Sequence, residues 1–169
     1  MFRDVITNKS QIFFDKRGYF FESYNKKVKE LIQKNFVQDN ISFSKNKYTF
    51  RGIHFQKKPY QQGKLVTVLK GKIIDIVVNI DPKSKFYLKH KKFYLEENKL
   101  NQIYVPDKYA HGFLTLTDDT LITYKVTKKF NKKSECGINI LDKKLKIIFK
   151  IKNQEKIILS EKDKNFKFL

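Results

Sequence analysis

Tryptophan is absent from this 169-residue sequence, and cysteine, proline and glycine are scarce, at one, three and six residues. The lone Cys136 cannot form an internal disulfide, which suits a reducing compartment, so we expect a cytoplasmic protein. No run of about 18 uninterrupted apolar residues occurs, which excludes a transmembrane helix, and we expect no membrane partner. Residues 1–4 also lack the long apolar stretch of a secretory signal. The length predicts one domain, residues 1–169, with a sizeable core.

Acidic residues are also scarce: the sequence has 17 acidic and 37 basic residues, which gives a formal net charge of +20. A basic domain is compatible with nucleic-acid binding. However, the lysines are spread along the whole chain, and no helix-turn-helix, zinc-finger or aromatic RNA-binding signature occurs. We therefore expect a solvated lysine surface and no nucleic-acid partner, although such a field would speed the arrival of a polyanion such as a nucleoside diphosphate.

Arginine is rare, because only three of the 37 basic residues are arginine. Arg17 and Arg51 therefore stand out as positions where a planar, bidentate group is required, as for phosphate or carboxylate. The alternative for each is a structural salt bridge. The three histidines form no His-x-His pair, no glutamate lies at ligand spacing and one cysteine is too few for a zinc site. We expect no metal, and the sequence has no phosphate-cradling glycine loop.

Short β segments separated by turn residues dominate the chain from residue 36 to residue 127. This spacing predicts an antiparallel sandwich or barrel, and the absence of alternating βα units argues against a doubly wound sheet. We expect a hairpin turn at residues 15–18, a short amphipathic helix within residues 25–35 and a tight hairpin at Lys70-Gly71. The lysine-rich stretch 143–169 is expected to wrap the surface, pinned to the core by Ile147, Ile148, Phe149 and Ile151.

The segment RGIHFQ at residues 51–56 places an arginine and a histidine close together on a predicted strand. Strand alternation puts Gly52, His54 and Gln56 on one face, and turns Arg51 to the other face unless a bulge intervenes. A histidine on a strand is more often structural than catalytic. Histidine is nevertheless the natural base near neutrality when a carboxylate holds its tautomer, and these residues alone do not say which carboxylate that is.

Asp75 is the one charged residue on an otherwise apolar predicted strand, residues 73–78. An aspartate among isoleucines and valines is costly to bury unless it is paired. His111 and Lys64 are both plausible partners, and a structural and a functional role are equally open for the pair.

Nine short motifs follow one another between Phe14 and Asp163: Asp15-x-Arg17-Gly18-x-Phe20-Phe21-Glu22, Gln38-x-Asn40-x-Ser42, RGIHFQ (51–56), QGKLV (62–66), DIVV (75–78), Val105-Pro106, AHGFL (110–114), Tyr124-Lys125 and Leu159-Ser160-x-x-Asp163. In sequence and in order, these motifs resemble those of the dTDP-4-dehydrorhamnose 3,5-epimerase family, whose members are nucleotide-sugar epimerases. The resemblance implies a mainly β fold, a cupin-type jelly-roll sandwich or barrel with a few short helices.

The resemblance also implies a reaction, the inversion of C3 and C5 of a dTDP-4-keto-6-deoxy sugar in deoxysugar biosynthesis. His54 would be the base that removes a proton α to the ketone, with Asp163 as its orienting carboxylate. Tyr124 would be the acid on the opposite face of the sugar ring. Such chemistry needs a base on one face and a proton donor on the other. No cofactor is implied, since the ketone is itself the electron sink.

The remaining site residues implied by the resemblance stabilise the enolate or bind the nucleotide sugar. Lys64, with His111 held by Asp75, would stabilise the enolate oxygen. Arg51 would bind the diphosphate, and Gln38 and Asn40 would line the sugar or phosphate pocket. Three residues near the N-terminus would help bind the nucleotide: Arg17, Phe20 and Glu22. The nucleotide could be that of their own chain or of a neighbouring subunit, since the family forms homodimers by exchanging N-terminal strands.

Phe130 departs from the family, which usually has a tyrosine there, and this leaves open whether both C3 and C5 are inverted. A single-carbon epimerase or a sugar 3,4-ketoisomerase on the same fold is therefore a rival interpretation. A non-catalytic sugar-nucleotide-binding module is a third, although such a module would be expected to lack the base or the acid.

Overall fold

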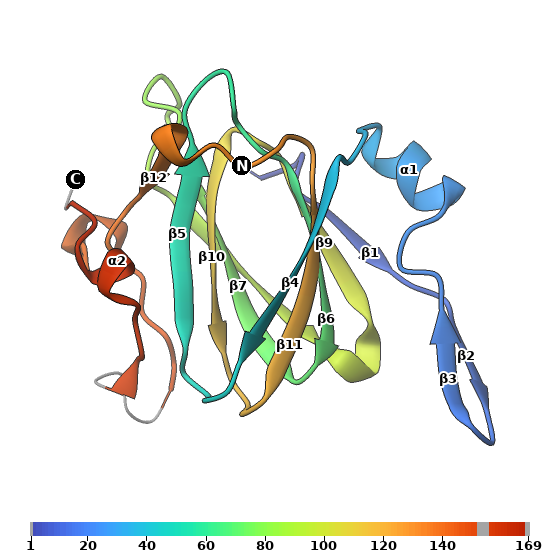
Figure 1. Cartoon of the computed structure of the whole chain (residues 1–169). Helices are drawn as coiled ribbons and strands as arrows, with labels where there is room; N and C mark the ends of the chain where they lie inside the picture. The colour runs from blue at the N-terminus through green and yellow to red at the C-terminus, as the bar shows by residue number, and fades with distance from the viewer. Residues whose placement is uncertain (1, 152–155, 168–169) are drawn as a thin grey trace.

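The computed structural model describes residues 2–151 and 156–167. Two five-stranded sheets face each other, a small hairpin lies apart from them, and the helices are few and short (Figure 1). The expected jelly-roll architecture is confirmed. No helix in the described part of the chain is long and apolar enough to cross a membrane.

All ladders within the two sheets are antiparallel. The first sheet has this order: β1 (Ile6–Lys9), β9 (Asn101–Val105), β6 (Lys64–Lys70), β11 (Thr120–Val126), β4 (Gln38–Ser44). The second sheet has this order: β12 (Glu135–Gly137), β5 (Phe50–Gln56), β10 (Tyr109–Thr115), β7 (Lys72–Asn79), β8 (His90–Glu96). Among the described residues, the short helices are α1 (Lys26–Ile32) and α2 (Glu161–Lys164), with 3₁₀ turns at η1 (Glu97–Lys99), η2 (Lys132–Ser134) and η3 (Lys143–Leu145).

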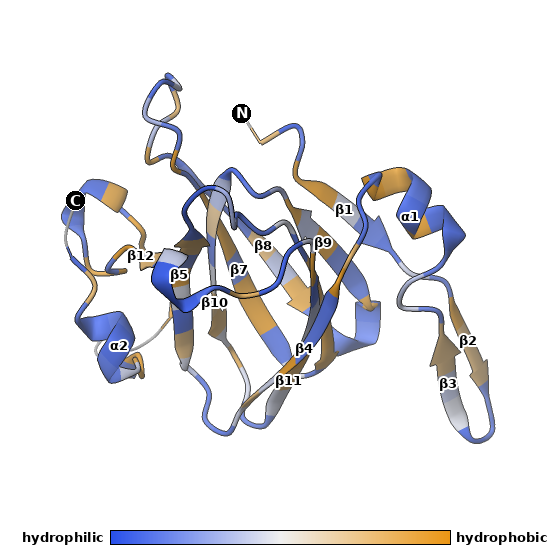
Figure 2. Cartoon of the chain, turned by 45° about the horizontal axis from the view of Figure 1, so that its top comes forward, coloured by the Kyte–Doolittle hydropathy of each residue, from blue (hydrophilic) through white to orange (hydrophobic). Residues whose placement is uncertain are grey.

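The main core lies between the two sheets, because each strand alternates its apolar side chains toward the other sheet. On β7, Ile73 and Val77 point into this core, whereas Ile74, Ile76 and Val78 point outward. β7 is therefore apolar on both faces, as the orange ribbon of that strand shows in Figure 2. A strand buried on both faces needs a second layer to cover it.

The C-terminal segment supplies that second layer over the outer face of the second sheet (Figure 1). Phe149 is buried against Phe50, with ring centroids 5.8 Å apart, and Ile147 and Ile151 pack at the margin. The prediction for Ile148 was wrong, because its side chain is 61% exposed. Alternation in this extended segment turns Ile148 to solvent between its two packed neighbours. Part of the predicted stretch, residues 152–155 and 168–169, lies outside the described residues.

The tight hairpin predicted at Lys70-Gly71 does not form, although the chain does turn there. β6 and β7 flank Gly71, but they belong to different sheets and share no ladder. Gly71 has φ +88, and an added Cβ would lie 2.4 Å from Thr117 Oγ1, so the corner has room only for glycine. The strands predicted on either side of Gly71 do form, but strand propensity does not distinguish a hairpin from a corner between two sheets.

The N-terminal region forms a hairpin and then a helix at the side of the first sheet. β2 (Ile12–Asp15) and β3 (Gly18–Phe21) pair with Asp15 opposite Gly18, which confirms the predicted turn. α1 begins at the N-cap Asn25, whose side chain accepts a hydrogen bond from the Val28 N–H. Val28 and Ile32 pack the helix onto the sheet, whereas the hairpin projects away from the body of the chain (Figure 1).

Candidate active site

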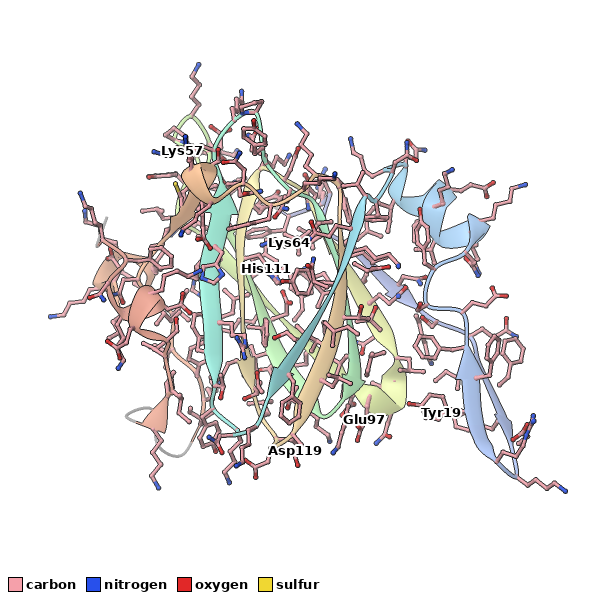
Figure 3. The ribbon with its side chains drawn as sticks, in the orientation of Figure 1. Tyr19, Lys57, Lys64, Glu97, His111 and Asp119 are labelled. Carbon is pink, nitrogen blue, oxygen red and sulfur yellow. The ribbon has the colours of Figure 1, made fainter. Side chains whose placement is uncertain are left out.

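A cavity of about 600 Å³ opens between the two sheets. Its size is within the range of small-molecule sites. Polar side chains from both sheets line it, including Arg51 and His54 from the second sheet and Lys64 and Tyr124 from the first. Figure 3 shows Lys64 and His111 in the interior between the sheets, far from Tyr19 on the projecting hairpin.

A bulge in β5 turns both Arg51 and His54 toward this cavity. His111 of β10 pairs with His54, whereas Phe113, two residues further along, pairs with Arg51, three residues back. β5 thus carries one extra residue, which reverses the alternation locally. Ile53 points outward, toward the C-terminal segment that covers the second sheet, while Arg51 and His54 both line the cavity. The Arg51 guanidinium is held by the carbonyl of Phe43 at 2.9 Å.

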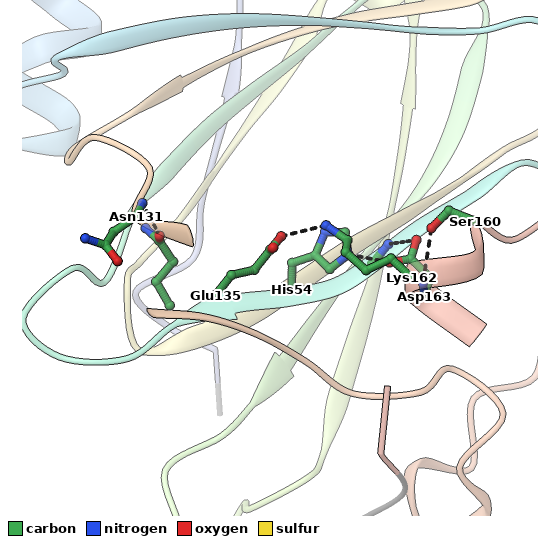
Figure 4. A network of polar contacts seen from close by, with 8 residues as sticks. His54, Asn131, Glu135, Ser160, Lys162 and Asp163 are labelled. Atoms are coloured by element: carbon green, nitrogen blue, oxygen red, sulfur yellow. Dashed lines mark hydrogen bonds and ion pairs between the residues drawn. The ribbon is translucent and has the colours of Figure 1, made fainter. Parts of the chain in front are cut away.

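His54 forms a close pair with Asp163 of α2. Its Nε2 lies 2.7 Å from Asp163 Oδ1, and the aspartate is only 3% exposed (Figure 4). Asp163 also accepts a 3.4 Å hydrogen bond from the Gly52 N–H, and its own N–H donates to Ser160 Oγ. Burial raises the pKa of the Asp163 carboxyl, but the hydrogen bonds, that to His54 foremost, outweigh it and leave the pKa below its ordinary value. The carboxylate is therefore ionised and orients the imidazole.

Tyr124 approaches the cavity from the opposite sheet. It lies on β11 and faces inward beside Ile122, against the core. Burial raises the pKa of its phenol, and the nearby cations Arg51 and Lys162 partly oppose this rise. The hydroxyl is therefore protonated at neutral pH and can serve as a proton donor.

Lys64 lies on the same inward face of the first sheet as Tyr124. It pairs directly with Val126, two residues from Tyr124 on β11. Burial lowers the pKa of its amine to about 8, against the opposing attraction of Asp75 and Glu135. The amine thus stays largely cationic at pH 7.

His111 is the cross-strand partner of His54 and forms a second histidine–aspartate pair. Its Nε2 lies 2.7 Å from Asp75 Oδ2, and Asp75 is fully buried. His111 rather than Lys64 is therefore the hydrogen-bonded partner of Asp75. Asp75 itself does not line the cavity; it contacts His111, which does, and bears on the cavity through that imidazole.

Three further predicted residues lie near the cavity with differing access to it. Gln38 and Asn40 face inward on β4, and Asn40 pairs with Tyr124, but the residue of β4 that lines the cavity is Ser42. The Gln38 amide donates to Asn40 Oδ1 at 2.6 Å, so the two side chains are bound to each other beside the cavity rather than in it. Phe130 does line the cavity, with half of its surface exposed.

The predicted nucleotide-binding residues of the N-terminal hairpin do not reach the cavity of their own chain. Arg17 lies at the exposed hairpin tip and is bonded to Asp15. Phe20 is 63% exposed, and Glu22 accepts a hydrogen bond from Asn25. Because the hairpin projects from the body, one chain alone leaves these three residues outside its site (Figure 1).

Sequence analysis missed several polar residues of the cavity wall. Glu135 and Lys162 form an ion pair of 2.6 Å beside the His54–Asp163 pair (Figure 4). Lys162 adjoins Asp163 on α2, and glutamate is rare in this lysine-rich chain, so both had a weak local signal. Gln56 and Gln62 also line the cavity and belong to recognised motifs, but those motifs alone assigned them no role.

The cavity therefore holds an oriented imidazole on one sheet and a protonated phenol with a cationic amine on the other. This arrangement can remove a proton from one face of a bound molecule and return one to the opposite face. Within residues 2–151 and 156–167, no group of three histidine, cysteine or acidic side chains is placed to hold a metal ion. Fold and site together define a jelly-roll protein with acid–base groups in its cavity.

Comparison with known proteins names the family. The model of the dTDP-4-dehydrorhamnose 3,5-epimerase family matches residues 1–169. The dTDP-4-dehydrorhamnose 3,5-epimerase of Shigella flexneri is 38% identical over 165 residues, which cover 96% of this chain and 89% of that protein. The chain belongs to the dTDP-4-dehydrorhamnose 3,5-epimerase family, as its motifs predicted.

Solved structures agree with this assignment. The Bacillus anthracis dTDP-4-dehydrorhamnose 3,5-epimerase, with TDP and PPi bound, superposes with a TM-score of 0.91 at 38% identity, covering 99% of this chain and 95% of that one. The Legionella pneumophila dTDP-6-deoxy-D-glucose-3,5-epimerase, in complex with dTDP-4-keto-L-rhamnose, gives a TM-score of 0.89 at 35% identity, covering 98% and 87%.

Proposed function

We propose that this chain, as one jelly-roll domain, epimerises a dTDP-4-keto-6-deoxyhexose at C3 and C5. The observation that carries the proposal is the placement of the His54–Asp163 pair and Tyr124 on opposite sheets of a single cavity. A sugar ring lying between the sheets would present one face to the imidazole and the other to the phenol. The substrate class is supported by the relatives, two of which hold TDP or a dTDP-keto sugar.

The reaction begins when His54 takes the proton from the carbon beside the ketone. Asp163 holds the imidazole in place and stabilises the imidazolium that forms. The electron pair moves to the ketone oxygen and gives an enolate. Lys64 and His111 stabilise this oxygen by charge and hydrogen bonding, in a site where burial strengthens both.

Tyr124 then delivers its proton to the same carbon from the opposite face, which inverts that centre. His54 then releases its proton to solvent and Tyr124 takes one up, and repetition at the second carbon flanking the ketone completes the double epimerisation. The ketone accepts the electron pair at each step, so the reaction as written uses no cofactor. Arg51, a planar cation at the cavity margin, binds the diphosphate.

A second copy of the chain completes the site in this proposal. The hairpin β2–β3 exposes Phe14 (74%) and Phe20 (63%), and the outer face of the edge strand β4 exposes Ile41 (72%) and Phe43 (53%). Apolar surfaces of this kind on projecting elements favour burial against a partner. In a homodimer the hairpin of one protomer would bring Arg17, Phe20 and Glu22 to the nucleotide end of its partner's cavity.

The direct test is product analysis. The protein is incubated with dTDP-4-keto-6-deoxyglucose, and ring proton couplings in the product are read by NMR. Inversion at both C3 and C5 is the expected result. An unchanged substrate, under conditions where dTDP binds, would contradict the proposal and leave a binding module. The cytoplasmic location stays a prediction, which fractionation of the native host would check.

One observation favours a second candidate, a single-carbon epimerase. Phe130 lines the cavity and has no hydroxyl with which to assist proton transfer at a second carbon. The same NMR experiment in D₂O separates the two candidates. Deuterium at both C3 and C5 supports double epimerisation, and deuterium at one carbon alone supports the rival.

A further inference from the structure

Two loops that border the cavity are bonded to each other: residues 57–63, between β5 and β6, and residues 127–134, after β11. Gly63 and Thr127 exchange two hydrogen bonds of 2.9 and 3.0 Å. The Gln62 side chain donates to the Lys128 carbonyl at 2.6 Å. The paired loops therefore form one wall of the cavity rather than two independent segments.

Gln56 ties the paired loops together from the cavity side. It ends β5 and lines the cavity, yet it is only 6% exposed. Its Oε1 accepts a 2.7 Å hydrogen bond from the Asn131 N–H, and its Nε2 donates a 2.7 Å hydrogen bond to the Tyr60 carbonyl. One carboxamide thus holds the backbone of both loops, each through a different atom.

These bonds fix the backbone on either side of Phe130. The carbonyl of Lys128 accepts from Gln62, and the N–H of Asn131 donates to Gln56. Phe130 stands between these anchors with its ring on the cavity wall. Gln56 also shares a strand with His54, two residues away, so one strand carries both the base and the support of the wall.

We propose that Gln56 is a positioning residue that holds Phe130 against the bound sugar nucleotide, which deepens and rests on the proposed function. A polar side chain in a cavity is usually assumed to contact the substrate. Here each polar atom of Gln56 is engaged by a loop backbone, so the residue acts through the wall. A loose wall must be ordered on binding, which costs affinity without changing the chemical step.

The first test is independent of turnover. Gln56→Met keeps the length and bulk of the side chain and removes both hydrogen bonds. Amide hydrogen exchange, followed by NMR, should quicken at Asn131, whose N–H is the direct partner of Gln56. The amide of Ile138, bonded to the Ile53 carbonyl, serves as the control and should not change. Unchanged exchange at Asn131 would overturn the proposal even if the protein proved to have no epimerase activity.

The second test asks whether Gln56 acts through Phe130. Gln56→Met should raise KM for dTDP-4-keto-6-deoxyglucose about 3- to 10-fold with kcat nearly constant. In a Phe130→Ala background the same substitution should add little, because the ring it positions is gone. Additive effects on KM, or a loss confined to kcat, would instead show direct contact with the substrate and overturn the proposal.

A conservative variant keeps the test valid if Gln56→Met does not fold. Gln56→Glu retains Oε1 as the acceptor for Asn131, loses the donor to Tyr60 and sets a carboxylate oxygen against the Tyr60 carbonyl. Exchange at Asn131 should then stay slow, while exchange in residues 57–63 quickens. Fast exchange at Asn131 in this variant would contradict the assigned bond.

Discussion

Arg51 and His54 face the same cavity although they are three residues apart on one strand. The bulge in β5 makes this possible, and Gly52 makes the bulge possible. Gly52 has φ +130, and a Cβ there would lie 2.6 Å from the Gly112 Cα. The close approach of the β5 and β10 backbones thus places Arg51, which we propose binds the diphosphate, beside His54, the proposed base.

Gly52→Ala should therefore damage both stability and activity. We expect the free energy of unfolding to fall by more than the roughly 1–3 kcal/mol that a strained backbone costs, since the new methyl group meets backbone that cannot move aside. Gly18→Ala is the matched control, because Gly18 has φ +135 and no atom within 4 Å of the added methyl. Denaturant unfolding at one protein concentration compares them, and equal losses would refute the close-packing account.

Tyr124→Phe should separate proton removal from net inversion. The phenol is needed only to return a proton, so His54 should still exchange the substrate's proton with solvent. We expect NMR in D₂O to show exchange continuing while epimerisation falls by about 10² to 10⁴-fold. Parallel loss of the two rates would count against Tyr124 as the acid.

Activity should decline in alkaline solution as Lys64 loses its proton. Its pKa of about 8 predicts that kcat/KM falls above this pH, because the neutral amine no longer stabilises the enolate. Lys64→Arg keeps its charge, so the alkaline limb of its pH profile should move to higher pH, toward the raised pKa of Tyr124. A limb near pH 8 in both proteins would assign it to another group.

The Lys64 amine should have the opposite effect on stability, which should increase with pH where activity decreases. Its folded-state pKa lies below the ordinary 10.5, so the unfolded chain binds more protons between pH 8 and 10.5. Stability contributed by this group therefore rises with pH across that window. The Tm of the wild type minus the Tm of Lys64→Met should therefore increase as pH rises from 8 to 10, as measured by calorimetry.

The exposed hairpin should control assembly. Replacing Phe14 and Phe20 with serine removes apolar surface that we propose a second copy buries, so sedimentation velocity should show a shift toward monomer. Leu141→Ser is the control, because Leu141 is 64% exposed in the segment that follows β12, on the opposite side of the molecule (Figure 1). Equal sedimentation of the two variants would contradict the proposed interface.

Much of the fold was predictable from local pattern. Alternation located most strands, and the helical spacing of Val28, Leu31 and Ile32 marked the helix. The corner at Gly71 was mistaken for a hairpin, because strand propensity does not say which sheet a strand joins. Ile148 was misjudged because an apolar residue in an extended segment can point either way.

The site was harder to predict because its parts are far apart in the chain. His54 and Asp163 are separated by 109 positions, and only family resemblance linked them before the structure. The bulge at Gly52 was left open by alternation alone. Glu135 had only a weak local signal, and the motif that contains Gln56 assigned it no role, since both roles depend on which loops and helices meet at the cavity.

His54→Ala, assayed for deuterium uptake from D₂O into a dTDP-4-keto-6-deoxy sugar, tests the central claim most directly. Removing the imidazole should abolish incorporation at the carbons flanking the ketone, while dTDP affinity measured by calorimetry stays near that of the wild type. Incorporation at the wild-type rate in this variant would show that another group removes the proton and that the account is wrong.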